Sequence, residues 1–187
     1  LGPDGVDASL EVRGSTFAGN GTEGLDLDLA AAPLAGPNGS RFQIELEECT
    51  FELNGAAGML LDIDFELVAG WSADVSLRGL YARANAGAGV HLDLDWQATA
   101  LVQRLLSSAN GGDGLYVSSE SRPGLAVVSS SALVGNGGFD GTVVLMHDTH
   151  GAMSIDAGRV YAGAGVASPK VARFAATHGF EGAEFLA

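Results

Sequence analysis

One phrase recurs five times along this chain: an asparagine, three or four further residues, a glycine, and then a strand of alternating apolar residues. Successive asparagines of the phrase are 34, 31, 25 and 26 residues apart. Self-similarity at such spacings is typical of chains in which each repeat forms one turn of a stack and covers the apolar face of the next. The phrases begin at Asn20, Asn54, Asn85, Asn110 and Asn136.

Apolar residues recur at fixed distances before and after each asparagine. They stand ten and eight residues before it, and then at every second position after the glycine. Apolar residues two apart are the pattern of a β-strand with one buried face. We therefore expect two strands in each repeat, one on either side of a corner that contains the asparagine. Equivalent residues should stack in columns, such as Leu10, Ile44, Val75, Ala100 and Ala126.

The asparagines are expected to form a buried ladder. Parallel strands stack about 4.8 Å apart, so an inward amide can bond to the equivalent amide of the next repeat. The glycine that follows is expected to adopt a backbone conformation that residues with a Cβ rarely adopt. In the fifth phrase Gly141 comes one position later than its equivalents, so we expect one extra residue there.

The phrase N-x-x-x-G-[LMV]-x-[LV] resembles the repeat of the right-handed parallel β-helix (pectin-lyase-like) superfamily. The resemblance covers about residues 10–165 and implies an all-β fold, a right-handed single-stranded parallel β-helix (solenoid) of about 5–7 coils. We expect a single domain over 1–187, which could also be a segment of a longer protein. Residues 168–187 are expected to cap the coils, with a short helix over 169–178, because Ser168-Pro169 is typical of a helix start and Gly179 of a helix stop.

Composition excludes several classes of partner. The net charge of −14 argues against nucleic acid and anionic membranes, which bind basic surfaces. No apolar run approaches the length of a membrane span, so membrane insertion is not expected. The single cysteine, Cys49, cannot form an internal disulfide, and its column of small and apolar residues favours a buried thiol over a nucleophile.

Acidic residues occupy the outward positions of the strand that follows the glycine. If the columns are in register, Asp62, Asp64, Asp93 and Asp95 form a square about 4.8 Å across the repeats. Such carboxylates suit Ca²⁺, and carboxylate pairs also flank the scissile bond in glycosidases. We favour a third interpretation, the solvated face of a half-buried strand. The candidate metal ligands are Asp28, Asp62, Asp64, Asp93, Asp95 and Glu120, and the catalytic candidates are Asp62, Asp64, Asp93, Asp95 and His91.

Aromatic and histidine residues supply the remaining candidates. Trp71 and Tyr116 lie on or beside the acidic face and are candidates for stacking on sugar rings. His147, Asp148 and His150 form a second candidate metal cluster, although a surface turn without metal is favoured there.

We expect a non-catalytic extracellular or cell-surface module that binds a carbohydrate or a protein, or that acts as a rigid spacer. The alternative is a carbohydrate-active enzyme, a polysaccharide hydrolase or lyase, that uses the acidic face. The module is favoured because the repeats are complete, whereas the Arg-x-Lys clamp and the Asp-Asp doublet that the resemblance implies for polygalacturonase-like hydrolases are not found. The expected partners are a polysaccharide or a surface protein, with end-to-end or lateral self-association. No cofactor is assigned, and Ca²⁺ is the one candidate.

Overall fold

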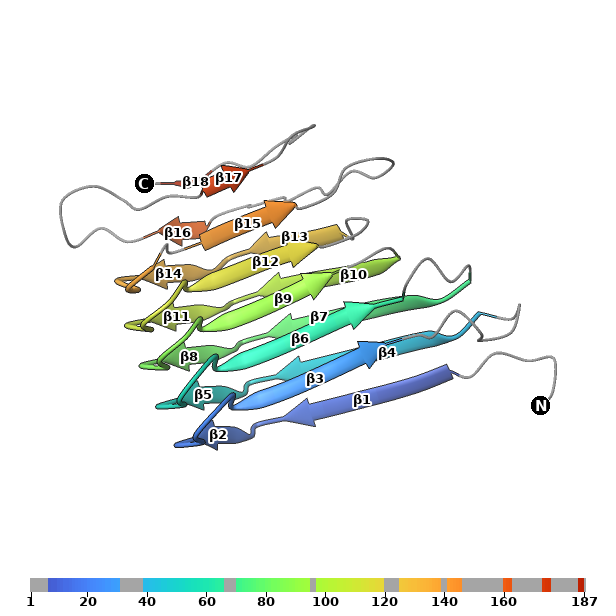
Figure 1. Cartoon of the computed structure of the whole chain (residues 1–187), viewed down its shortest axis with the longest axis horizontal. Coiled ribbons are helices and arrows are strands. Elements are labelled where there is room, and N and C mark those ends of the chain that lie inside the picture. The colour runs from blue at the N-terminus through green and yellow to red at the C-terminus, as the bar shows by residue number, and fades with distance from the viewer. Residues whose placement is uncertain are drawn as a thin grey trace.

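A computed structural model of the chain describes residues 7–30, 39–65, 70–94, 97–119, 125–138, 141–145, 160–162, 173–175 and 185–186. All regular elements in these ranges are strands, as Figure 1 shows. No membrane-spanning helix is found among these residues.

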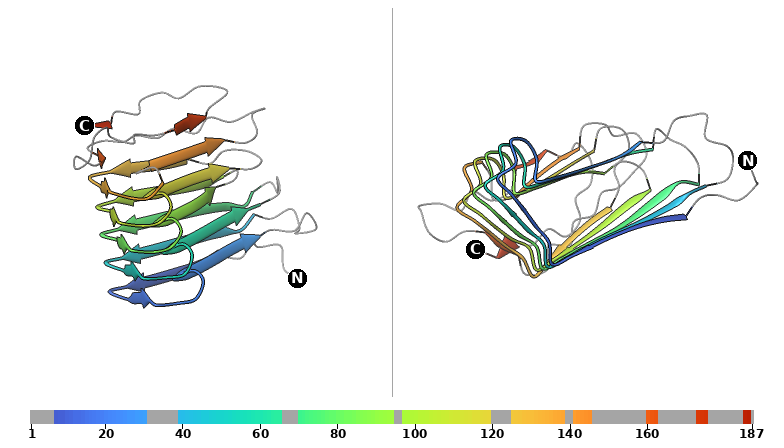
Figure 2. Two further views of the ribbon diagram at one scale, coloured as in Figure 1. Left: turned by 60° about the vertical axis from the view of Figure 1, so that its left-hand side comes forward. Right: turned by 90° about the horizontal axis from the view of Figure 1, so that it is seen from below.

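The strands lie in three parallel sheets, which the chain visits in turn (Figures 1 and 2). Sheet A contains β1 (Asp7–Arg13), β4 (Arg41–Glu47), β7 (Ser72–Arg78), β10 (Ala98–Gln103) and β13 (Leu125–Ser129). Sheet B contains β2 (Thr16–Ala18), β5 (Thr50–Glu52), β8 (Tyr81–Arg83), β11 (Leu106–Ser108), β14 (Ala132–Val134), β16 (Val160–Ala162) and β18 (Phe185–Leu186). Sheet C contains β3 (Leu25–Ala30), β6 (Met59–Asp64), β9 (Val90–Leu94), β12 (Leu115–Ser119), β15 (Gly141–Leu145) and β17 (Arg173–Ala175). We call one passage through sheets A, B and C a coil.

Alternation of apolar and polar residues explains which face of each strand is buried. In β6 the burial alternates strictly along the strand, with Met59, Leu61 and Ile63 inward. Their columns continue through the other coils, so the three sheets enclose one continuous apolar core. The strands form because an inward side chain such as Leu61 packs between its equivalents in the neighbouring coils, Leu27 and Leu92.

Strand pairing follows the predicted columns. Leu10 pairs with Ile44, Ile44 with Val75, Val75 with Ala100, and Ala100 with Ala126. The extra residue expected in the fifth phrase is not there. Asn136 bonds to Asn110, and Gly141 pairs with Leu115. The number of residues from the asparagine to the strand is therefore the same in the fourth and fifth coils.

Two expected elements were wrong. Each coil contains three strands and not two, because the three-residue strands of sheet B are too short for alternation to reveal them. The helix expected over 169–178 is also contradicted, since Arg173–Ala175 is strand β17. This segment pairs with β15 and extends sheet C, so pairing with the existing sheet prevails over the local helical pattern. The rest of 168–187, apart from β18, lies outside the described residues.

The asparagines lie in one column on the corner between sheets B and C. Asn85 Oδ1 accepts hydrogen bonds from the backbone N of Asn54 at 3.1 Å and from its Nδ2 at 2.9 Å. Asn85 Nδ2 in turn donates to Asn110 Oδ1 at 2.9 Å and to the carbonyl of Phe51 at 3.1 Å. One side chain therefore connects three coils, and at 1% exposure it does so without competition from water.

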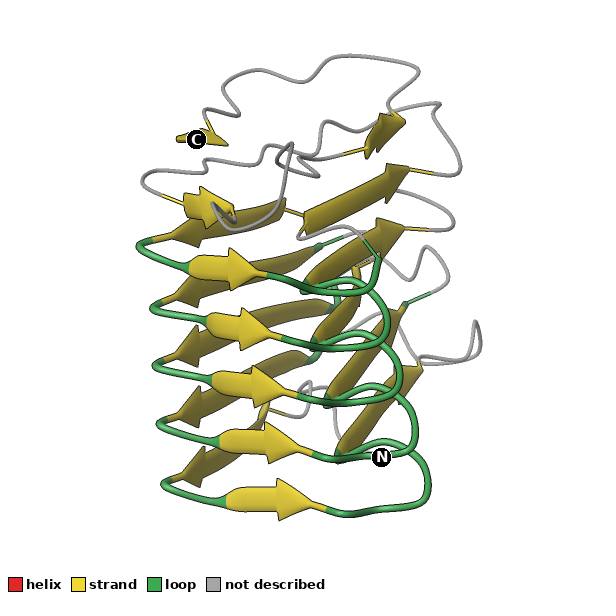
Figure 3. Ribbon diagram, turned by 90° about the vertical axis from the view of Figure 1, so that its left-hand side faces the viewer, coloured by secondary structure: helices red, strands yellow, loops and turns green. Residues whose placement is uncertain are grey.

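The glycine of the phrase has a different role from the expected one. Gly58 does not have a positive φ; it is needed because the corners of successive coils approach closely. A Cβ there would lie 2.5 Å from the carbonyl oxygen of Gly89 and 2.7 Å from Asn85 Nδ2. Figure 3 shows these corners stacked on one side of the molecule.

Left-handed backbone occurs instead at the two corners that flank the strands β2, β5, β8, β11 and β14 of sheet B. The positive φ angles of these residues range from 52° to 68° in all five coils. They form two columns: Gly14, Glu48, Gly79, Arg104 and Ser130, and then Gly19, Leu53, Ala84, Ala109 and Gly135.

Replacing a glycine at these corners tests the backbone requirement. We expect Gly19→Ala to lower the free energy of unfolding by about 1 kcal/mol, because its φ of 68° is unfavourable for a residue with a Cβ. Gly21→Ala is the matched control, since both glycines have open space where a Cβ would lie but Gly21 lacks a positive φ. Equal losses in urea unfolding would contradict this explanation.

Candidate functional site

The outer face of sheet C carries a column of carboxylates. Asp28 pairs with Asp62 and Asp62 with Asp93, and Ser118 follows in the same column. Asp28 is exposed, whereas Asp62 and Asp93 are half-buried. The structure therefore brings together three of the predicted acidic residues on adjacent coils.

The predicted square of carboxylates is described in part. Asp64 lies outward on β6, beside Ala30 of the preceding coil. Asp95 and Glu120 lie outside the described residues, as do His147, Asp148 and His150. In the described part of the chain, no group of three His, Cys, Asp or Glu side chains could hold a metal ion. Calcium binding therefore stays a prediction.

His91 and Tyr116 form a contact next to this column. They pair across β9 and β12, and their rings meet edge to face with centroids 4.6 Å apart. Ser118 Oγ lies 3.4 Å from His91 Nε2. Tyr116, a candidate for stacking on a ligand, thus packs its ring against a histidine of the neighbouring coil.

Burial governs the titration of both groups. Burial lowers the pKa of His91 below its ordinary value of 6.5, although the nearby Asp113 opposes the change. The pKa of Tyr116 is raised by burial and further by the charges of Asp93 and Asp113, against a hydrogen bond with Ser118. At neutral pH the histidine is therefore neutral and the tyrosine protonated.

Trp71 lies in an aromatic cluster at the start of β7. Its ring centroid is 5.6 Å from that of Phe42 and 5.8 Å from that of Phe65, and Phe42 also stacks on Phe65. The indole packs against the core, so the face proposed for sugar binding is in contact with other rings. Cys49 is fully buried with its sulfur 3.4 Å from the carbonyl of Glu47, as a structural thiol would be.

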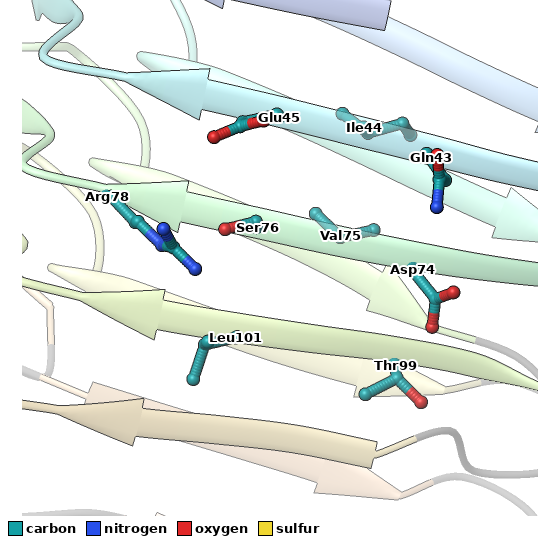
Figure 4. A pocket seen from close by; sticks show the side chains of 9 residues that line it. All are labelled: Gln43, Ile44, Glu45, Asp74, Val75, Ser76, Arg78, Thr99 and Leu101. Carbon is teal, nitrogen blue, oxygen red and sulfur yellow. The ribbon is translucent and has the colours of Figure 1, made fainter. Parts of the chain in front are cut away.

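A groove of about 350 Å³ lies on the outer face of sheet A, a site that the sequence did not suggest (Figure 4). It crosses β4, β7 and β10, and its polar side chains include Glu45, Asp74, Ser76 and Arg78. The signal in the sequence was the outward column Glu45, Ser76, Leu101, in which the small serine leaves room beside larger neighbours.

The charges around the groove are unevenly paired. Asp74 accepts from Arg41 at 2.6 Å, and Glu45 lies 3.6 Å from Arg13. Arg78 forms no ion pair with any residue that the structure describes. Its Nε and the hydroxyl of Ser76 also have no hydrogen-bond partner within that part of the chain. The groove thus holds two unused donors and a guanidinium whose charge no described carboxylate neutralises at contact distance.

Acidification tests the burial of His91. A histidine with a lowered pKa in the folded state binds its proton more readily when unfolded. The contribution of the neutral, buried His91 to the free energy of unfolding should therefore be present in full above pH 6.5. It should decrease as the pH drops below that value. We expect His91→Gln to lose less stability over this interval, measured by urea unfolding at several pH values. Identical pH profiles for the two proteins would contradict the assignment.

Sequence comparison relates the chain to a named enzyme. A protein of Thiobacillus denitrificans named UDP-N-acetylenolpyruvoylglucosamine reductase is 38% identical over 138 residues, which cover 64% of this chain and 41% of that protein. Proteins with the same name from Nitrosospira multiformis and Nitrosomonas eutropha are 50% identical over 64 residues and 42% identical over 65. Each of these two matches covers 32% of this chain, with 18% of the Nitrosospira protein and 20% of the Nitrosomonas protein.

The chain spans less than half the length of these relatives. No family model matches the chain. No solved structure matches it either.

These relatives correct several expectations. Their name denotes reduction of a UDP-linked sugar, which is neither cleavage of a polysaccharide nor passive binding at a cell surface. The resemblance to the pectin-lyase-like superfamily is therefore wrong, and so is the fold class drawn from it, the right-handed parallel β-helix with a capping helix. The non-catalytic surface module, the alternative glycoside hydrolase or polysaccharide lyase, and the extracellular location are likewise overturned.

Proposed function

We propose that this chain is part of a reductase that acts on UDP-N-acetylenolpyruvoylglucosamine. The supporting observation is that relatives from three organisms carry this one name, with a match that extends over 64% of this chain. Because the chain spans 41% or less of each relative, the activity is proposed for the complete protein to which such a stretch belongs.

The chemistry of the named substrate sets requirements for a site. A UDP-linked sugar carries a diphosphate, and an enolpyruvoyl group adds a carboxylate next to a carbon–carbon double bond. Reduction of that bond adds a hydride to one carbon and a proton to the other, with the hydride drawn from a reduced donor. The anionic groups need arginine, lysine or backbone N–H donors.

Of the described surfaces, the groove on sheet A suits those anionic groups better than the face of sheet C. The groove offers the guanidinium of Arg78, while its carboxylates Asp74 and Glu45 lie beside Arg41 and Arg13. The column Asp28, Asp62 and Asp93 would repel a diphosphate. We therefore propose that Arg78 is the residue of the described coils that contacts the substrate.

Direct assay tests the proposed activity. The full-length protein and this chain are each incubated with UDP-N-acetylenolpyruvoylglucosamine and a reduced nicotinamide dinucleotide as the hydride source. We expect the full-length protein to convert the substrate to a product heavier by two hydrogen atoms, detected by mass spectrometry. An unchanged substrate with the folded full-length protein would contradict the proposal.

Binding of the same substrate tests the role of Arg78 separately. Loss of a hydrogen bond to a charged group costs about 1.5–3 kcal/mol, so Arg78→Gln should weaken binding about tenfold or more in calorimetry. Arg83→Gln is the control, because Arg83 pairs with Glu52 on sheet B at 2.8 Å, outside the groove. Equal affinities of wild type and Arg78→Gln would remove the groove from the site without bearing on the activity.

A further inference from the structure

A column of alternating charge runs beside the groove on sheet A. It consists of Arg13 on β1, Glu47 on β4 and Arg78 on β7, which pair in register across the three strands. Adjacent strands lie about 4.8 Å apart, so Glu47 has an arginine within reach on either side. Glu47 lies 3.5 Å from Arg13, whereas no ion pair joins it to Arg78. The glutamate thus pairs with one of its two neighbours.

Arg13 also pairs with a second carboxylate that could reach the groove arginine. Its guanidinium lies 3.6 Å from Glu45, which lines the groove on the strand next to Arg78, and it contacts Glu11 on its own strand. Without Arg13, the two glutamates of β4 would have Arg78 as their nearest arginine, because Arg41 stands at the other end of that strand. The pairing of Arg13 therefore decides whether these glutamates are available to Arg78.

The guanidinium of Arg78 is directed away from β4. Figure 4 shows it extending from β7 toward β10, next to Ser76 and Leu101. Its Nε is buried, and neither this atom nor the hydroxyl of Ser76 has a hydrogen-bond partner within the described ranges. A buried donor without an acceptor is costly, so an acceptor that a ligand supplies would stabilise this arrangement.

An internal ion pair would compete with such a ligand. If Arg78 paired with Glu45 or Glu47, the anionic group of a ligand would have to displace that carboxylate. The carboxylate is always present on the adjacent strand, whereas the ligand must bind from solution. The affinity would therefore fall by the free energy needed to break the internal pair.

We propose that Arg13 is a positioning residue for the substrate. By pairing with Glu45 and Glu47, it leaves Arg78 available for an anionic group of the substrate. Arg13 is not among the residues that line the groove, so it acts through the two glutamates and not by contact with the ligand. The inference rests on the proposed function, because it takes Arg78 as the residue that contacts the substrate.

Binding of UDP-N-acetylenolpyruvoylglucosamine to variants of the full-length protein tests this role. Arg13→Gln should weaken binding about threefold to fivefold in calorimetry, as expected when an exposed ion pair must first be broken. In a background that carries both Glu45→Gln and Glu47→Gln, the same Arg13→Gln should have no effect, because no carboxylate is then left to occupy Arg78. A merely structural role of Arg13 would give the same loss in both backgrounds.

Two further variants control for charge. Arg13→Lys should keep most of the wild-type affinity, because an ammonium group still neutralises the two glutamates. Arg83→Gln removes the same charge from sheet B, where Arg83 pairs with Glu52, and should bind like wild type. Circular dichroism verifies that each variant folds.

A crystal structure of Arg13→Gln gives a readout that does not need the substrate. We expect Arg78 to lie within about 4 Å of Glu45 or Glu47 in that variant, the distance of an ion pair. An Arg78 that still extends toward β10 without an ion pair would overturn the proposal, as would wild-type affinity of Arg13→Gln or an equal loss in both backgrounds. A wild-type protein that does not bind the substrate would overturn the proposed function, and the crystal structure would still decide whether Arg13 keeps the glutamates from Arg78.

Discussion

Hydrogen bonding between equivalent asparagines constrains every other feature of this structure. Each buried side chain bonds to the coil before it and the coil after it, so a coil that slips out of register loses both sets of bonds. A bond of this kind contributes about 1 kcal/mol, but an amide left buried without its partner costs about 1–3 kcal/mol. Because the asparagines bond directly to one another, the corners that carry them approach closely in successive coils. Only glycine fits at Gly58 and its equivalents for that reason.

The same constraint explains what the sequence could predict. The columns were predictable because side chains alternate and because the asparagine fixes the register of each repeat. The strands of sheet B were missed because three residues are too few for their alternation to stand out in the sequence. The helix over 169–178 was wrong because Arg173–Ala175 pairs with sheet C as a strand. The resemblance to a repeat superfamily was wrong because a local phrase reports stacking geometry and not ancestry.

The candidate sites were also predictable only in part from the sequence. Register placed Asp28, Asp62 and Asp93 in one column, but it could not show that His91 packs against Tyr116 or that Trp71 packs against Phe42. The groove on sheet A was missed because its charge depends on which arginines pair with which carboxylates, and the small Ser76 alone did not suggest it. Those pairings join coils and follow from side-chain geometry. The stack thus presents an acidic column on sheet C and, on sheet A, a groove that contains Arg78 together with Glu45 and Asp74.

Exchange of the asparagine side-chain amide protons with solvent tests the ladder most directly. In a nuclear magnetic resonance experiment, the Nδ2 protons of Asn54, Asn85 and Asn110 should exchange slowly, because each group is buried and bonded to a neighbouring coil. Those of Asn20, at the exposed end, should exchange much faster. If all four exchange equally fast in the folded protein, the asparagines do not hold the coils together.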